Sequence, residues 1–485
     1  MTGDSSILAG LLLYLAFMVI VGVLSSRYMK SLDDYVLGGR RLGPWVAAIS
    51  ERASGESAWF LLGLPGAAYG MGFVGFWAVI GIASGILFSW TFIAIPLRRQ
   101  TAAMGALTIP DYFEMRFGDR SRMLRLFSTV AILVFYTAYV AAQLNGAGKI
   151  LEATFGIPVE YGLLTGAVVV LLYTMLGGFL AVAWTDLIQG VLMTAVAVVL
   201  PVVGLIKIGG FGKLSEALQS RGDGFMSMSG GEAGSAFLFG VVVANLSWGL
   251  GYLGQPHLLT RYMAIRKTSE LPKSGAIAMG WTLLSYWGAP FIGIVGLAIL
   301  GPDLADPEQV MPLLAKALMP GWLAGLMIAG ATAAMMSTAD SQLLVASSAV
   351  VEDICVRLLG IRASAAKLVL MSRAATVIIA GIALYLAWAS LNNSRIIDAT
   401  VSYAWTGLGA SFGPPLLLAL WWKRTRRAGA LAGMVGGMVA TILWKNFESL
   451  GAVLDIKAAA VLISALLVVS VSLWGNAAGA ERTTG

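Results

Sequence analysis

The sequence predicts an all-α protein that crosses a membrane about thirteen times. Of its 485 residues, 58% are hydrophobic and only 12% are charged, whereas soluble domains carry roughly 25% charged residues. The hydrophobic residues gather in stretches long enough to cross a bilayer as helices, and the alternating pattern of membrane β-strands is not seen. The composition therefore excludes a soluble enzyme, a disordered chain and a membrane β-barrel.

The first apolar stretch, 6–26, is predicted to be an uncleaved leading helix. It has the length of a membrane span, exceeds a signal-peptide core and follows no basic segment. The other predicted spans are 44–66, 71–96, 125–148, 160–179, 184–207, 235–257, 273–300, 321–349, 368–391, 397–421, 427–446 and 458–476.

The charge distribution predicts the orientation of these spans. The chain has 32 Lys and Arg against 25 Asp and Glu, a net charge of +7. Basic residues follow the first, third, seventh, ninth and eleventh spans, and such loops are cytoplasmic. We therefore expect an N-terminus outside and a C-terminus in the cytoplasm. We attribute the positive charge to cytoplasmic loops beside the lipid bilayer and not to nucleic-acid binding. One cysteine and one histidine exclude an intrachain disulfide and a multi-histidine metal site.

Two spans are expected to be interrupted. The run Glu51–Ser57, ERASGES, places charges, Gly and Ser inside the second span, and the seventh contains several glycines before Pro256. Gly and Ser weaken helices, and charges at this depth are costly unless they line a cavity. Matched interruptions five spans apart are typical of a transporter with two inverted five-helix halves. For the glycines of the seventh span, close helix packing remains an equal alternative.

These residues belong to a wider pattern in which the chain resembles the sodium/solute symporter family, most closely its bacterial sodium/proline symporters. The resemblance is carried by DDYVLGGRRLGPW (33–45), ASGESAWFLLGLPGA (53–67), LTIPDYFEMRFGD (107–119), GGFLAVAWTDLIQG (177–190), SWGLGYLGQPHLLTRYMA (247–264), MMSTADSQLLVASSAVVED (335–353) and SYAWTGLGASFGPPLL (402–417). It implies a leucine-transporter-type fold in one domain, 1–485, with a leading helix (6–26), repeats at about 44–207 and 235–421, and trailing helices (427–476). It also implies sodium-coupled uptake of a small amino acid, L-proline before others, across a bacterial inner membrane.

A sodium site is expected where an unwound helix faces hydroxyl groups, because sodium prefers hard oxygen ligands. Ser337 and Thr338 lie in the middle of the ninth span, although Ser and Thr also bond back to their own helix. The resemblance implies an ion held by these two hydroxyls and by carbonyls at Ala53, Glu56 and Ala334.

Two further acids lie in or beside apolar spans, Asp186 and Asp340, the latter followed by Ser341. In some family members the matching positions form a second cation site, and two neighbouring carboxylates attract a cation or retain a proton. The alternative is an N-cap for Asp186 and a buried, hydrogen-bonded acid for Asp340.

The substrate site is expected beside the interrupted spans. Proline has an apolar ring and a zwitterionic head, which suit aromatic side chains and the free amides of a broken helix. Aromatic residues in spans also serve packing and interfacial belts. The resemblance implies a site formed by Ser57, Trp59, Tyr139, Gln143, Trp248, Tyr252 and Pro256.

The chain departs from the proline symporters around its first interruption. Gly55 stands where they have an aspartate, Glu51 and Arg52 where they have small residues, and Glu56 where they have an apolar residue. Arg52 and Glu56 are four residues apart and can pair on a helix. We expect Glu56 to supply the negative field for sodium. The alternatives are that Arg52 replaces part of the cation requirement, or that Glu56 carries a proton.

Other functions are less consistent with the sequence. A proton-coupled or sodium-independent carrier of another small solute remains the alternative within transport. A transporter-like sensor is the alternative from another class, although no kinase or receiver sequence follows residue 476. Neither a nucleophile–base pair nor a nucleotide-binding motif is recognisable. We therefore expect a gradient-driven transporter, not an enzyme, whose ligands are the solute and sodium and which carries no other cofactor.

Overall fold

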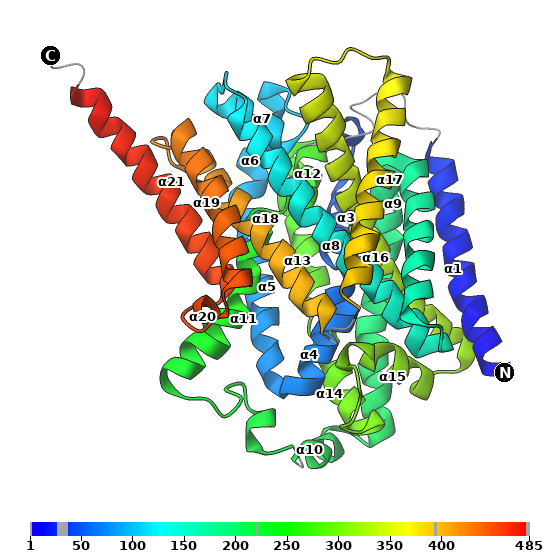
Figure 1. Cartoon of the computed structure of the whole chain (residues 1–485). Helices are drawn as coiled ribbons and strands as arrows, with labels where there is room; N and C mark the ends of the chain where they lie inside the picture. The colour runs from blue at the N-terminus through cyan, green and yellow to red at the C-terminus, as the bar shows by residue number, and fades with distance from the viewer. Residues whose placement is uncertain (1, 27–36, 220, 392–394, 482–485) are drawn as a thin grey trace.

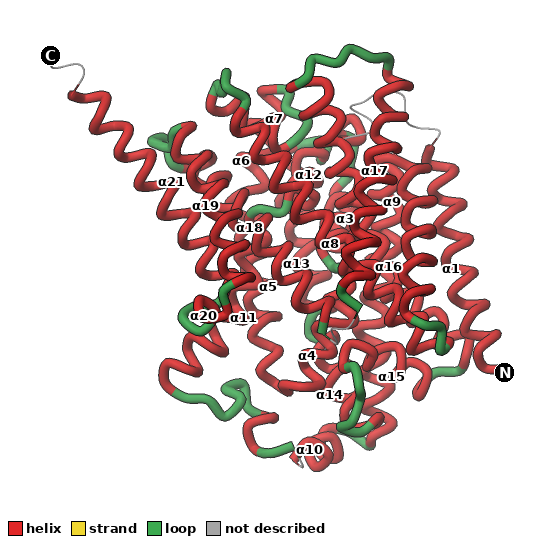
Figure 2. Tube along the Cα trace, in the orientation of Figure 1, coloured by secondary structure: helices red, strands yellow, loops and turns green. Residues whose placement is uncertain are grey.

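The computed structural model describes residues 2–26, 37–219, 221–391 and 395–481. Helices form nearly all of this part of the chain, and its β-type pairing is limited to an isolated bridge between Leu42 and Ile265. Figure 2 shows the helices joined by loops, without a sheet among the residues drawn in colour. The predicted all-α fold class is confirmed.

The helices of the first half of the described chain lie between Thr2 and Gln219. They are α1 (Thr2–Ser26), α3 (Pro44–Gly55), η2 (Trp59–Gly63), α4 (Leu64–Met71), α5 (Phe76–Phe88), η4 (Ser89–Ile93), α6 (Ala94–Met104), α7 (Ile109–Phe117), α8 (Met123–Phe155), α9 (Val159–Ile208) and α10 (Phe211–Gln219).

The second half begins with another irregular helix. Its main elements are η6 (Ala236–Val243), α11 (Ala244–Leu246), η7 (Ser247–Leu253), α12 (Pro256–Ala264), α13 (Leu271–Ser285), α14 (Gly288–Leu300), α15 (Val310–Leu318), α16 (Gly321–Ser348), η10 (Ala349–Leu358), α17 (Ala365–Ala389), α18 (Ile396–Trp421), α19 (Arg427–Asn446), α20 (Glu448–Gly451) and α21 (Ile456–Glu481).

Nine helical stretches in the described part of the chain are long and apolar enough to cross a membrane, and shorter apolar helices add to them. The spans predicted at 160–179 and 184–207 follow one another in α9 without a loop. The chain changes direction at Gly178, where φ is 55° and ψ is −172°, a conformation that glycine adopts at low steric cost. The count of thirteen spans remains a prediction.

The first expected interruption lies between α3 and η2. Pro44 opens α3 at a position where its missing N–H costs nothing. The helix ends at Gly55, and Glu56 has a non-helical backbone with φ −98° and ψ 87°. The π-type turn η2 then leads into α4. Backbone groups near residues 53–58 are thereby released from regular helical pairing and can serve a binding site.

The second interruption lies between η7 and α12. Gln255 is extended, with φ −83° and ψ 105°, and Pro256 opens the new helix. Gly254 permits a close approach here, because a Cβ at this position would lie 2.4 Å from the backbone nitrogen of Gly413 in α18. The sequence correctly predicted both interruptions.

The two interrupted helices lie inside the bundle. α16 packs against α1, α8 and α9, and α18 packs against α8, α19 and η7. In Figure 1, α1 and α21 stand at opposite edges of the bundle, and the start of α1 and the end of α21 point to opposite faces. The basic residues Arg27 and Lys30, used for the predicted orientation, lie outside the described residues.

Candidate functional site

Five of the seven predicted substrate residues line one narrow cavity between the two helix interruptions, together with Gly55, Ile82, Tyr286, Val401 and Trp405. The five are Ser57, Trp59, Tyr139, Trp248 and Tyr252. The rings of Trp59 and Trp248 stack with a centroid distance of 4.3 Å and a tilt of 32°. Tyr252 meets Trp405 edge-on at 4.7 Å. We call this space the aromatic cavity.

The other two predicted substrate residues lie next to the interruptions but outside this cavity. The side-chain oxygen of Gln143, on α8, accepts a hydrogen bond of 2.8 Å from the backbone N–H of Ala58. It therefore holds the first interruption in place. Pro256 starts α12 and borders a different small cavity with Thr108 and Asp353.

Trp405 and Tyr286 are cavity residues that the sequence reasoning missed. The indole N–H of Trp405 donates to the carbonyl of Trp248 at 3.0 Å. A Cβ at Gly251 would lie 1.8 Å from that indole nitrogen, so this glycine makes room for the ring. Trp405 lies in the motif 402–417, and its depth in a span was a usable signal. Tyr286 lies in no motif that carried the resemblance.

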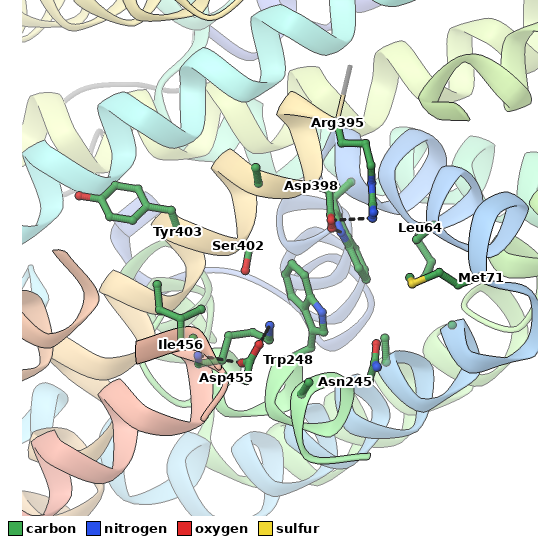
Figure 3. A pocket seen from close by; sticks show the side chains of 18 of the residues that line it. Leu64, Met71, Asn245, Trp248, Arg395, Asp398, Ser402, Tyr403, Asp455 and Ile456 are labelled. Atoms are coloured by element: carbon green, nitrogen blue, oxygen red, sulfur yellow. Dashed lines mark hydrogen bonds and ion pairs between the residues drawn. The ribbon is translucent and has the colours of Figure 1, made fainter. Parts of the chain in front are cut away.

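A wider cavity of about 430 Å³ lies on the other side of the two tryptophans. Trp59 and Trp248 border both cavities, so their stacked rings form the partition. Figure 3 shows this space, which we call the vestibule, with charged side chains at its edge. Its ion pairs are Arg395–Asp398 at 2.9 Å and Lys457–Asp455 at 3.1 Å.

The partition is anchored from the vestibule on both sides. The indole N–H of Trp59 donates to Asp398 at 2.9 Å. The ammonium group of Lys457 lies 4.8 Å from the ring centroid of Trp248, a favourable cation–π distance. Lys457 belongs to the trailing helix α21, so a helix outside the expected ten-helix core contacts the partition.

The predicted sodium ligands lie together around the end of α3. The Ser337 hydroxyl lies within hydrogen-bond distance of two carbonyls, that of Ala53 at 2.9 Å and that of Ala334 at 3.1 Å. The Thr338 hydroxyl donates to the carbonyl of Ser54 at 3.0 Å. We call this set of buried oxygens the hydroxyl site. The donor set fits sodium, which prefers neutral and anionic oxygen ligands.

Glu56, the fifth predicted ligand, touches this set through its backbone. Its N–H donates to the Ala53 carbonyl at 3.3 Å. Ser54, which the prediction did not include, supplies the carbonyl that Thr338 contacts. The interruption therefore brings Ala53 and Ser54 to one side, while Ser57 and Trp59 border the aromatic cavity.

The residues of the predicted second cation site surround an arginine. The guanidinium of Arg261 contacts Asp186 at 3.1 Å, the Ser54 hydroxyl at 2.8 Å and the Ser341 hydroxyl at 2.7 Å. The Ser341 hydroxyl also lies 3.3 Å from Asp340. These residues are fully buried. We call Asp186, Arg261 and Asp340 the aspartate cluster. The sequence reasoning counted Arg261 among basic loop residues and missed its position here.

A second group of buried charges, the glutamate cluster, consists of Glu51, Arg52 and Glu56. Arg52 pairs with both oxygens of Glu51, with an Nε–Oε2 distance of 2.6 Å, and with Glu56 at 3.3 Å. The predicted pairing of Arg52 with Glu56 is therefore present, and Glu51 is the closer partner. Glu51 also accepts hydrogen bonds from Trp90 at 3.1 Å and Tyr262 at 3.2 Å.

The face away from the vestibule is held by buried ionic contacts. Arg125 on α8 pairs with Asp111 at 2.6 Å, with Glu114 at 2.5 Å and with Asp353. Near it, Arg98 donates to the carbonyl of Ile265 at 2.8 Å. The Arg125 contacts tie α7 and α8 to η10, and the Arg98 contact ties α6 to the end of α12. The vestibule therefore reaches toward the partition from one face, while the other face is closed by ion pairs.

An all-helical membrane protein with two interrupted helices, an aromatic cavity and a nearby set of oxygen ligands has the architecture of an ion-coupled secondary transporter. A family model described as the sodium:solute symporter family matches residues 35–437. The chain belongs to this family, as its motifs predicted.

The chain is similar to bacterial proline transporters over most of its length. It is 40% identical over 446 residues to the sodium/proline symporter of Escherichia coli, covering 90% of this chain and 87% of that protein. It is 41% identical over 433 residues to the high-affinity proline transporter PutP of Bacillus subtilis, covering 88% and 90%.

A solved sialic acid symporter, described as sodium-coupled and outward-open, has a similar fold. Its TM-score is 0.82, with 22% sequence identity and coverage of 97% of both chains. At this identity the likeness concerns the fold, and it supports the predicted arrangement of the interrupted helices.

Proposed function

We propose that the protein is a secondary active symporter that couples sodium influx to the uptake of L-proline or a close analogue by alternating access. One observation carries the proposal: a single interruption serves two sites. The carbonyls of Ala53 and Ser54 meet the hydroxyl site, and Ser57 and Trp59 border the aromatic cavity. The names of the proline-transporting relatives support the substrate.

The aromatic cavity suits the chemistry of proline. The faces of Trp59 and Trp248 offer apolar surface for the pyrrolidine ring, and aromatic faces also attract an ammonium group. Backbone amides at the start of a helix segment attract a carboxylate. The interruption after Gly55 provides such amides next to Ser57.

Coupling follows from the shared segment. Sodium supplies a positive charge that draws carbonyl and hydroxyl oxygens together. The residues that respond are Ala53 and Ser54 on the interruption and Ser337 and Thr338 on α16. Ordering residues 53–58 also places Ser57 and Trp59 at the cavity. Each ligand thereby lowers the cost of ordering the segment for the other, which gives positive coupling between their affinities.

We place the protein in a bacterial inner membrane, with the N-terminus outside and the C-terminus in the cytoplasm. In this setting 1–485 is one transport domain, whose repeats at about 44–207 and 235–421 are related by inverted topology. The vestibule then opens to the outside and the Arg125 contacts close the cytoplasmic face. The basic loops of the sequence and the position of the two ends, with the start of α1 and the end of α21 at opposite faces, support this orientation.

Proton coupling is the second candidate because both charged clusters contain one more acid than arginine. The glutamate cluster lies directly at the interruption. In the aspartate cluster, one oxygen of Asp186 and one of Asp340 accept no hydrogen bond from the described part of the chain. A carboxylate in such surroundings can hold a proton.

Uptake of labelled proline into proteoliposomes, with sodium and pH gradients imposed separately, tests the proposal. We expect accumulation with an inward sodium gradient and none with a pH gradient alone. Accumulation driven by the pH gradient alone would replace sodium with the proton. Failure to accumulate or bind proline under either gradient would overturn the proposed substrate.

A further inference from the structure

A chain of hydroxyl groups joins Glu56 to the aromatic cavity. The Tyr286 hydroxyl donates to the carboxylate of Glu56, and the hydroxyl oxygens of Tyr286 and Tyr252 lie 2.9 Å apart. Both tyrosines line the cavity, whereas Glu56 lies behind them. All three residues are buried. Glu56 is therefore connected to the cavity by hydrogen bonds through two tyrosine hydroxyls.

The direction of these hydrogen bonds is set by the carboxylate. An ionised carboxylate only accepts, and a tyrosine has one proton to donate. The carboxylate of Glu56 also accepts a hydrogen bond of 3.3 Å from the guanidinium of Arg52. Because Tyr286 donates to Glu56, Tyr252 must be the donor in its contact with Tyr286. The remaining lone pair of the Tyr252 oxygen is then available only as an acceptor.

The surroundings hold Tyr252 in this position. Its ring packs edge-on against Trp405 at 4.7 Å, and the Arg52 guanidinium lies 5.0 Å from its centroid. The charge of Arg52 is directed to Glu51 through two N–H groups. Arg52 thus holds the Tyr252 ring in place, while the carboxylate of Glu51 balances the charge of Arg52.

We propose that Glu56 and Tyr286 are positioning residues that make Tyr252 a hydrogen-bond acceptor for the charged N–H of the substrate. This inference rests on the proposed transport of proline and assigns the contact that selects its ammonium group. A ligand of the same shape with a ring oxygen in place of the ring N–H offers no donor to Tyr252. Hydrogen bonds to charged groups correspond to roughly 10–100-fold in affinity, so the cavity prefers proline by at least about tenfold.

The test is competition against labelled proline at saturating sodium, using purified protein in proteoliposomes. The competitors are unlabelled proline and tetrahydrofuran-2-carboxylate, in which an oxygen replaces the ring nitrogen. The measured quantity is the ratio of their inhibitory concentrations, which is independent of the amount of folded protein. We expect Tyr286→Phe and Glu56→Gln each to lower the preference for proline at least fivefold. Either change leaves the Tyr252 proton free to turn toward the cavity.

Tyr262→Phe is the matched control. It also removes a buried tyrosine hydroxyl that contacts the glutamate cluster, but this hydroxyl contacts Glu51 and Ser89, and Tyr262 does not line the cavity. We expect the ratio of this variant to equal that of the parent protein.

The outcomes separate the inference from the proposed function. If the parent binds proline and the ratio is unchanged in Tyr286→Phe and Glu56→Gln, the inference is wrong and the function stands. An equal fall in Tyr262→Phe also overturns it, because the effect is then not directed through Tyr252. A parent that does not bind proline overturns the proposed function, and the inference with it.

Discussion

Two buried clusters flank the first helix interruption, each with two carboxylates and one arginine, and they differ in how their oxygens are satisfied. In the glutamate cluster, every carboxylate oxygen accepts a hydrogen bond, from Arg52, Trp90, Tyr262 or Tyr286. In the aspartate cluster, the Oδ1 atom of Asp186 and the Oδ2 atom of Asp340 accept none within the described part of the chain. The two clusters therefore carry the same formal net charge. In the glutamate cluster all carboxylate oxygens are hydrogen-bonded, and in the aspartate cluster two carboxylate oxygens are not, among the described residues.

This difference indicates distinct roles for the two clusters. The donors around the glutamate cluster favour ionised carboxylates, and an ionised cluster would set a negative field beside the hydroxyl site. The aspartate cluster is neutralised in part by Arg261, which takes the hydroxyls of Ser54 and Ser341 and one oxygen of Asp186. A second sodium would need those same oxygens. By contrast, the Ser337 and Thr338 hydroxyls of the hydroxyl site contact backbone carbonyls in the described part of the chain and no charged side chain.

The largest expected effect comes from breaking the Asp186–Arg261 pair. Asp186→Asn leaves the buried guanidinium without its carboxylate partner, which typically costs about 3–5 kcal/mol. We expect a lower thermal unfolding temperature of the purified protein. Adding Arg261→Gln to Asp186→Asn removes the unpaired charge and restores part of the stability.

Asp340→Asn is the matched control for that prediction. It removes the other carboxylate of the cluster. Arg261 forms its ion pair with Asp186, whereas Asp340 contacts the Ser341 hydroxyl. We expect a loss below about 1 kcal/mol, since like-charge repulsion between the two acids is also relieved. Equal losses in Asp186→Asn and Asp340→Asn would contradict the assigned pairing.

The next effect concerns the hydroxyl site. Ser337→Ala and Thr338→Ala each remove an oxygen that the backbone cannot replace. We expect the sodium concentration for half-maximal uptake to rise roughly 10–100-fold, with little change in the amount of protein. Thr332→Ala is the control on the same helix, because its hydroxyl bonds back to Ile328 at 3.2 Å. Unchanged sodium dependence in the first two variants would make their hydroxyls structural.

A third expectation is one sodium per substrate. With the membrane potential held at zero, a tenfold sodium gradient supports about tenfold accumulation with one ion and about hundredfold with two. Because Arg261 already holds the oxygens of the second site, we expect about tenfold. Accumulation near hundredfold in the parent, reduced to tenfold in Asp340→Asn, would instead establish a second ion at the aspartate cluster.

The fold was predictable because its main signals are local. Hydropathy located the spans, and the ERASGES run and the glycines before Pro256 located both interruptions. The turn between the predicted spans 160–179 and 184–207 gave no such signal, since Gly178 changes the direction of the chain inside α9 without a polar loop. Composition has no signal for a bend made by a single backbone angle.

The candidate site was predictable only where residue type and family position agreed. Ser337, Thr338 and the stacked tryptophans met that condition. Arg261 did not, because an arginine near the end of a span is ordinarily a cytoplasmic residue, and its burial depends on a contact with the distant Asp186. Tyr286 was missed for a similar reason: an aromatic residue in a span resembles packing until Glu56 lies beside it.

The smallest expected effect distinguishes Glu56 from Arg52. A unit charge roughly 8–15 Å from an ion contributes about 1–2 kcal/mol at an effective dielectric constant of about 20. Glu56→Gln removes this charge from the residue whose backbone contacts Ala53. We therefore expect roughly 5–30-fold weaker sodium activation. Arg52→Gln removes a positive charge and is expected to retain sodium dependence.

Uptake measured as a function of sodium in both variants decides among three arrangements. If Glu56 supplies the negative field, only Glu56→Gln weakens sodium activation. If Arg52 replaces part of the cation requirement, uptake by the parent is independent of sodium and becomes dependent on it in Arg52→Gln. If Glu56 carries a proton, a pH gradient alone drives uptake and Glu56→Gln abolishes that response. We expect the first result, because Arg52 is directed mainly to Glu51, which leaves the charge of Glu56 the less compensated of the two.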